Sequence, residues 1–185
     1  MPKSLPARCD VVIIGGGIVG NSIAYHLGKI GITNTVVLER KQLTSGTTWH
    51  AAGLVGQLRA SKNLTELAKY TTGLFEGLEK ETGQATGFKQ NGSISIALTD
   101  GRMEELLRGA SMAKCFGLAV DVVSTAEIKE RVPHYNMDGV KGGVFLPKYG
   151  QVNPIDVTQA LASGARSRGA KIFENTKVTR ILVEK

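Results

Sequence analysis

The stretch Asp10-Val-Val-Ile-Ile-Gly-Gly-Gly-Ile-Val-Gly20 decides the fold. In its first part, residues 10–14, Asp10 is followed by a continuously apolar run of β-branched side chains, which predicts a strand buried on both faces of a parallel sheet. From Ile18 the apolar residues recur at helical spacing, and this helix ends near Gly28 and Gly31. Residues 35–38 predict a second buried strand, which completes a βαβ unit with a right-handed crossover.

The glycines of this unit form the pattern Gly15-x-Gly17-x-x-Gly20 between the strand and the helix. In this position Gly15 permits a tight turn, Gly17 lets the backbone approach a pyrophosphate, and Gly20 lets the helix pack closely on the strand. Phosphate charge is then expected on the free N–H groups of the first helical turn, near Ile18 and Val19. The pattern therefore predicts a dinucleotide site.

Glu39 ends the second predicted strand and indicates which dinucleotide binds. A carboxylate there can accept hydrogen bonds from a ribose diol, whereas a 2′-phosphate would meet an unfavourable negative charge. Glu39 therefore favours FAD or NAD over NADP. The alternative, in which the glycines only turn a strand into a helix, fits the complete βαβ context less well.

The middle of the chain has a different pattern. Asn63 and Glu66 predict a capping box that opens a helix ending near Gly83. The region that follows, residues 88–148, alternates short strands with helices and predicts a separate sheet. Its predicted strands are 92–98, 120–123 and 143–146, and its predicted helices are 100–117 and one from Ser124 to Pro133.

The pattern of the first unit returns after this region. Asn153 as N-cap and Pro154 at the first helical position open a helix that ends near Gly169, and residues 171–173 and 178–183 predict two further strands. We therefore expect an α/β fold. Its doubly wound Rossmann-like domain is predicted to comprise residues 1–87 and 149–185, with part of a mixed-sheet domain, residues 88–148, inserted between them.

Composition excludes several classes of protein. Of 185 residues, 42% are hydrophobic and 21% are charged, which is typical of soluble globular chains. The net charge of +7 is spread along the chain, and only 5% of residues are aromatic, so nucleic acid is not an expected partner. The longest nearly apolar run, residues 11–20, is interrupted by glycines and is about half of the ~20 residues of a membrane span.

The sequence contains no pattern of a signal peptide or of a metal site. The first residues have no apolar segment of a signal peptide, which favours a cytoplasmic location, or the mitochondrial matrix in a eukaryote if a transit peptide has been removed. Cys9 and Cys115 stand alone, so neither a disulfide framework nor a metal site is predicted. His26 and His134 are expected to be ordinary helix and loop residues.

A second candidate ligand-binding segment is Leu43-Thr-Ser-Gly-Thr-Thr-Trp-His-Ala-Ala-Gly-Leu54. It has neither helical nor strand periodicity, and its small residues would let backbone amides come close to a ligand. Trp49 is the only tryptophan of the chain. From the residues alone, His50 is either a polar ligand contact or an ordinary loop histidine.

Several segments of the chain resemble the N-terminal part of the sarcosine dehydrogenase and dimethylglycine dehydrogenase family, flavoproteins of the D-amino-acid-oxidase type. They are Cys9-Asp-Val-Val-Ile-Ile-Gly-Gly-Gly17, Leu43–Gly53, Glu79-Lys-Glu-Thr-Gly83, Gln90-Asn-Gly-Ser-Ile94 and 165–171. The most specific is Ser-Gly-Thr-Thr-Trp-His, since few other flavoproteins place a histidine directly after that tryptophan. The resemblance implies that residues 1–87 and 149–185 bind FAD and that residues 88–148 are part of a substrate domain.

The resemblance also implies roles for single residues. It implies that His50 carries the flavin covalently, through its imidazole and the 8α-methyl carbon. Glu39 and Arg40 would lie at the adenosine ribose, and the backbone of Val178 would meet adenine. The segment along the flavin would comprise Gly46, Thr47, Thr48, Trp49, His50, Ala51, Ala52, Gly53 and Leu54.

The implied activity is FAD-dependent oxidation of the N-methyl group of sarcosine or dimethylglycine, small N-methylated amino acids. Electrons would pass to an electron-transfer flavoprotein or to oxygen. Family members continue well beyond this length, often with a folate-binding region, so the chain is expected to be a fragment that is inactive alone, with its catalytic residues beyond its end. An unpaired strand at 178–183 would then make the fragment associate.

Three alternatives remain open at this point. The first is an amino-acid oxidase of the same superfamily with dissociable FAD. The second is a non-catalytic regulatory protein on this scaffold, similar to the regulatory subunit of pyruvate dehydrogenase phosphatase. The third is an NAD-binding Rossmann protein without flavin.

Overall fold

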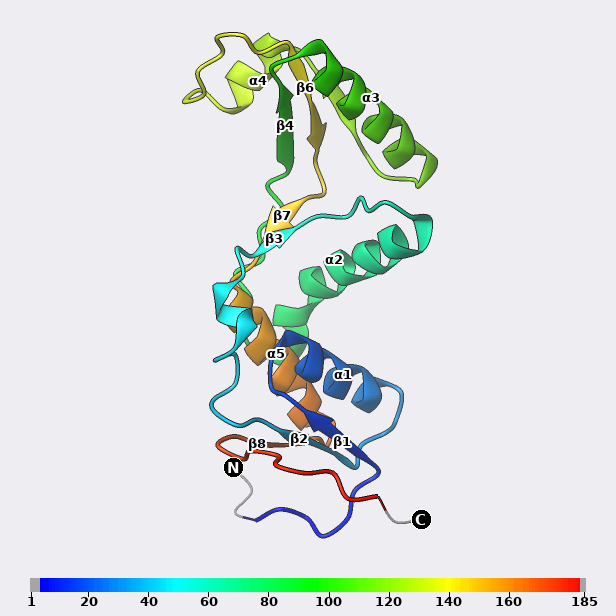
Figure 1. Ribbon diagram of the computed structural model, residues 1–185, viewed down its shortest axis with the longest axis vertical. Helices are drawn as coiled ribbons and strands as arrows, with labels where there is room; N and C mark the ends of the chain where they lie inside the picture. The colour runs from blue at the N-terminus through cyan, green and yellow to red at the C-terminus, as the bar shows by residue number, and fades with distance from the viewer. Residues whose placement is uncertain (1–3, 184–185) are drawn as a thin grey trace. The chain divides into compact units, whose positions relative to one another are not determined.

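The computed structural model describes residues 4–183, which divide into two compact units (Figure 1). Unit 1 comprises residues 4–53, 74–88 and 152–183, and unit 2 comprises residues 54–73 and 89–151. Helix α2 (Lys62–Thr82) belongs to both, because unit 1 resumes at Leu74. Among the described residues, no helix combines the length and the apolar character that a membrane span requires.

Unit 1 contains the parallel sheet that the first stretch of sequence predicts. Strands β1 (Val11–Ile14), β2 (Thr35–Leu38) and β8 (Lys171–Phe173) lie in the order β1-β2-β8, with β2 paired in parallel to both neighbours. Helices α1 (Ile18–Lys29) and α5 (Pro154–Ser167) pack against each other beside this sheet (Figure 1). The predicted α/β fold, with its βαβ unit, is confirmed.

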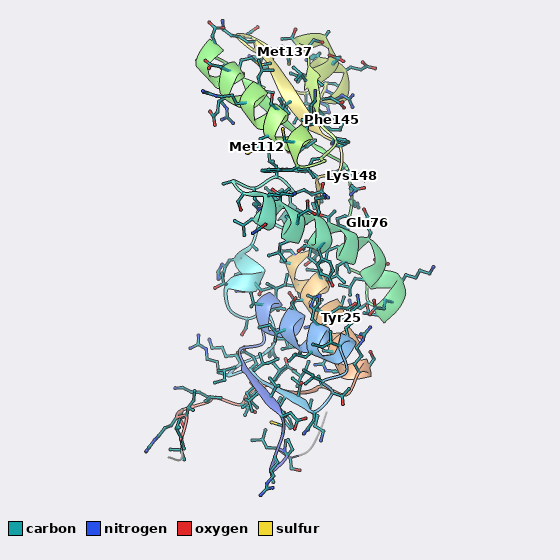
Figure 2. The ribbon with its side chains drawn as sticks, turned by 90° about the vertical axis from the view of Figure 1, so that its right-hand side faces the viewer. Tyr25, Glu76, Met112, Met137, Phe145 and Lys148 are labelled. Carbon is teal, nitrogen blue, oxygen red and sulfur yellow. The ribbon has the colours of Figure 1, made fainter. Side chains whose placement is uncertain are left out.

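Helices α1, α2 and α5 are joined by a buried tyrosine. Tyr25, labelled in Figure 2, is fully buried and donates its hydroxyl to both carboxylate oxygens of Glu81 on α2, at 2.9 and 2.8 Å. The guanidinium of Arg168 lies 4.8 Å from the Tyr25 ring centre and donates to the same carboxylate at 2.5 Å. A Cβ at Gly164 of α5 would lie 2.8 Å from the Tyr25 ring, so glycine there permits the close packing of α1 and α5.

The predicted burial of both faces of the first strand is wrong. Val12 and Ile14 are 52% and 57% exposed, whereas Ile13 is 8% exposed. Within the described part of the chain, β1 pairs only with β2 and is therefore an edge strand. Parallel sheets are normally covered on both faces, but no element of residues 4–183 covers Val12 and Ile14 fully.

Two other local predictions are corrected. Residues 178–183 do not form a strand, because no described strand pairs with them, and Ile181, Leu182 and Val183 are more than two-thirds exposed. The predicted Asn63 cap is also wrong, since α2 begins at Lys62. The hydroxyl of Ser61 accepts from Leu64 N–H at 3.4 Å instead.

Unit 2 contains the separate sheet predicted for the middle of the chain. Strands β4 (Ser93–Ala97), β6 (Gly142–Leu146) and β5 (Asp121–Val123) pair antiparallel in the order β4-β6-β5. Helix α3 (Asp100–Cys115) packs on this sheet, and α4 (Thr125–Arg131) contacts β6. The predicted Ser124–Glu127 capping box of α4 is confirmed. Phe145 of β6, labelled in Figure 2, lies 4.4 Å below the Arg131 guanidinium.

A hydrophobic cluster of unit 2 lies between α3 and the sheet. A pocket of about 240 Å³ lies beside it, lined in part by Leu58, Arg102, Glu105 and Tyr149. A two-stranded antiparallel pair, β3 (Leu54–Val55) and β7 (Gly150–Gln151), was not predicted, because two residues are too short for a periodicity. One cluster of buried hydrophobic residues in the unit comprises Ala110, Ala113, Leu118, Val120, Val144 and Leu146.

Candidate cofactor site

The glycine turn between β1 and α1 has the geometry that its sequence predicts. Gly15 has φ +113°, a conformation that side chains other than glycine rarely adopt, and its N–H donates to Leu38 O at 2.9 Å. A Cβ on Gly20 would lie 2.0 Å from the carbonyl oxygen of Gly15. Glycine at position 20 is therefore required for the first turn of α1 to pack against the end of β1.

Gly16, which the sequence motif leaves unassigned, is as constrained as its neighbours. Its N–H donates to Glu39 Oε2 at 2.7 Å. A Cβ on Gly16 would lie 2.4 Å from Leu43 Cδ2 and 2.9 Å from Glu39 Cβ. The run of three consecutive glycines, 15–17, is the signal that could have identified it.

Glu39 lies at the carboxyl end of β2, facing the glycine turn. Its second oxygen, Oε1, accepts from Lys41 N–H at 2.8 Å. Two backbone donors therefore fix the orientation of this carboxylate. Because each carboxylate oxygen has a further lone pair, Glu39 can still accept hydrogen bonds from a ligand.

A pocket of about 260 Å³ opens at the carboxyl ends of β1 and β2, where α/β sheets bind their ligands. Gly15, Glu39, Arg40 and Val178, four of the predicted site residues, line it. Thr176 and Lys177 line it as well and were not predicted, because nothing in their local sequence distinguishes them from a surface loop. The structure thus places Val178 in the same pocket as Gly15 of the glycine turn, although Val178 is not part of a strand.

The predicted flavin segment contains one ordered turn. Residues Thr47–His50 form a 3₁₀ turn, η1, which packs against α5. Its last two side chains are exposed, Trp49 at 55%, and their ring centres lie 4.1 Å apart. The imidazole of His50 is therefore accessible. Gly46, Thr47, Ala51 and Ala52 are also exposed.

The end of this segment is held by backbone contacts within unit 1. Gly53 has φ +74°, its carbonyl accepts from Val152 N–H at 2.8 Å, and a Cβ there would lie 2.2 Å from Val152 O. Leu54, 81% exposed, begins β3 in unit 2.

The start of the segment is attached to the glycine turn. Thr44 N–H donates to Gly16 O at 3.3 Å, and Thr44 is one of two described non-glycine residues with a positive φ, +69°. Leu43 N–H donates to Glu174 Oε1 at 2.7 Å. Backbone strain of this kind persists only where neighbouring contacts hold it, and it is common in ligand-binding segments.

The first helical turn differs from the expectation in one respect. Ile18 N–H is not free, because it donates to Thr48 Oγ1 at 3.1 Å. Thr48 is 8% exposed, and Val19, the next residue of α1, has a side chain that is 69% exposed. The turn that carries His50 is thus joined to the helix terminus that the sequence assigns to phosphate.

Asn21 supports the glycine turn from inside α1. It is fully buried, and its Nδ2 donates to Gly16 O at 2.9 Å and to Gly17 O at 3.0 Å. Its Oδ1 is buried without a hydrogen-bond partner among the described residues. A polar residue between apolar helical positions was the sequence signal for this role.

Glu81 of unit 1 has a shifted pKa. Burial raises the pKa of this carboxyl, but the hydrogen bonds from Arg168 and Tyr25, together with the charges of Arg168 and Lys29, outweigh it, so the pKa lies below its ordinary value. Among residues 4–183, no group of three or more His, Cys, Asp or Glu side chains could hold a metal ion.

The described residues fit a dinucleotide. A fixed carboxylate, a cationic side chain and a glycine turn surround one pocket, and a helix N-terminus lies beside that turn. Glu39, Arg40 and Val178 would hold the nucleoside end, and the first turn of α1 would hold phosphate. The exposed η1 turn is attached to the same terminus.

Comparisons with curated proteins give close relatives. Human mitochondrial sarcosine dehydrogenase is 43% identical over 98% of the chain, and rat mitochondrial dimethylglycine dehydrogenase is 39% identical over 97%. The mitochondrial pyruvate dehydrogenase phosphatase regulatory subunit of mouse is 38% identical over 98%. The chain spans 20–21% of the length of these relatives.

Solved structures share the fold. L-proline dehydrogenase from P. horikoshii has a TM-score of 0.91 at 30% identity, with 97% of this chain and 47% of that chain covered. Glycine oxidase from Bacillus cereus has a TM-score of 0.82 at 30% identity, with coverages of 96% and 50%. Residues 10–185 match the family of FAD dependent oxidoreductases known as DAO. The chain therefore belongs to the DAO family of FAD-dependent oxidoreductases.

Proposed function

We propose that this chain is the FAD-binding part of an oxidoreductase that removes a hydride from the N-methyl group of sarcosine or dimethylglycine. The names of two relatives give these two substrates, which are both N-methylated glycines. Unit 1 would bind the cofactor, and unit 2 would be part of the substrate domain. Bound FAD would supply the electron acceptor for this oxidation.

One observation carries the proposal: the exposed turn that ends in His50 is attached to the N-terminus of α1 through Thr48 and Ile18. A dinucleotide with its nucleoside end in the pocket at Glu39 would place its phosphates at that terminus. Its other half would then run along the turn, where Trp49 and His50 are exposed.

We also propose that His50 binds the flavin covalently. A neutral imidazole is a nucleophile near pH 7, since its unperturbed pKa is about 6.5. As its nitrogen bonds to the 8α carbon, the imidazole N–H bond and one 8α C–H bond would break and release two protons. The two electrons would remain on the flavin as its reduced form, which oxygen would then reoxidise. Trp49, in ring contact with His50, limits the orientations of the imidazole.

The rival readings differ in measurable ways. An amino-acid oxidase with dissociable FAD would leave His50 without a role. A regulatory protein on this scaffold would bind no amine substrate, and the mouse regulatory subunit shows that sequence identity alone does not separate the two. The accessible His50 after Trp49 favours the amine oxidoreductase.

Other parts of the proposal concern the complete protein. The groups that orient the substrate would come mostly from residues outside this chain. Electrons would pass to an electron-transfer flavoprotein or to oxygen, and the iminium product would be hydrolysed to formaldehyde, or its one-carbon unit transferred to tetrahydrofolate where a folate region is present.

The test uses protein expressed from the complete reading frame. Under anaerobic conditions, sarcosine or dimethylglycine is expected to bleach the oxidised flavin spectrum. Glycine, which lacks the N-methyl group, serves as the matched control and is expected to leave the spectrum unchanged. A flavin that no N-methylated amino acid reduces would contradict the proposed substrate class, and readmission of oxygen then separates an oxidase from a dehydrogenase.

A further inference from the structure

We draw no further inference here: the strongest candidate, the pocket of about 240 Å³ between helix α3 and the sheet of unit 2, is walled mostly by side chains of the hydrophobic cluster, its charged lining residues Arg102 and Glu105 are paired with each other, and nothing in the structure shows what covers it.

Discussion

The backbone N–H of Leu43 donates a 2.7 Å hydrogen bond to Oε1 of Glu174, so the start of the predicted flavin segment is held by the loop after β8. Leu43 is buried, and its Cδ2 occupies the space beside Gly16. Two parts of unit 1 that are 131 positions apart in sequence are thereby joined at the glycine turn.

Glu174→Ala is expected to destabilise this arrangement, because it leaves the buried N–H of Leu43 without its acceptor. The expected loss in the free energy of unfolding is about 1–3 kcal/mol, measured by denaturant titration. Glu174→Gln keeps an acceptor oxygen and is expected to recover most of the loss. Glu130→Ala, on an exposed face of α4, serves as the control. Equal effects of the Ala and Gln variants at position 174 would show that Leu43 N–H does not depend on this oxygen.

Gly20→Ala is expected to destabilise the chain by about 1–3 kcal/mol, because the added methyl group would overlap the carbonyl oxygen of Gly15. Gly77→Ala is the matched control: its Cβ would meet no atom within 4 Å inside α2. Since alanine favours helix over glycine, this variant is expected to be more stable by about 0.5–1 kcal/mol. Thermal unfolding checks both, and a neutral Gly20→Ala would contradict the close packing of α1 on β1.

The free energy of unfolding is expected to fall at acid pH, in part because the Glu81 carboxylate becomes protonated. Its pKa is lower in the folded chain than its ordinary value of 4.5. A lowered pKa contributes stability above pH 4.5, and this contribution is lost as the pH falls through the folded value. Because Glu81 and Arg168 are partly exposed, the contribution is about 1 kcal/mol or less.

The check compares the free energy of unfolding of Glu81→Gln with that of the parent from pH 3 to pH 7. The difference is expected to be present near neutrality and to shrink toward pH 3. A difference that does not vary with pH would exclude the carboxylate charge as its cause.

The 185-residue chain alone is expected to associate. Val12 and Ile14 of β1 are more than half exposed, and so are Ile181, Leu182 and Val183. Exposed apolar groups of this kind, beside an unpaired strand edge, favour contacts between copies. Sedimentation velocity checks this, and a monodisperse monomer across a tenfold range of concentration would contradict it.

The sequence predicted the elements whose signals are local. β2, α1, α4 and α5 lie within a residue or two of their predicted bounds, because caps and glycines mark their ends. The predictions that were wrong concern elements that need a pairing or packing partner elsewhere in the chain, which a local pattern does not specify. The run at 178–183 has the composition of a strand, but no described strand pairs with it.

In the candidate site, too, residues with a local sequence signal could be predicted, and residues whose roles depend on distant contacts could not. Gly15, Gly17 and Gly20 could be assigned from their spacing after a strand. Gly16 and Asn21 had only indirect signals, a third consecutive glycine and a polar residue between apolar helical positions. Glu174 had none, because its role comes from a contact with Leu43, which is 131 positions away. The 3₁₀ turn at Thr47–His50 had no periodic signal, since it is too short to show one.

The most direct test of the account is whether the flavin is bonded to His50. Protein from the complete reading frame is precipitated with acid, washed, digested and analysed by mass spectrometry. We expect a yellow precipitate and a peptide containing His50 that carries the mass of one FAD. His134→Ala, which changes an exposed histidine, is expected to keep this adduct, and His50→Ala is expected to lose it. A colourless precipitate with an unmodified His50 peptide, from protein that bound FAD before acid treatment, would contradict the covalent attachment.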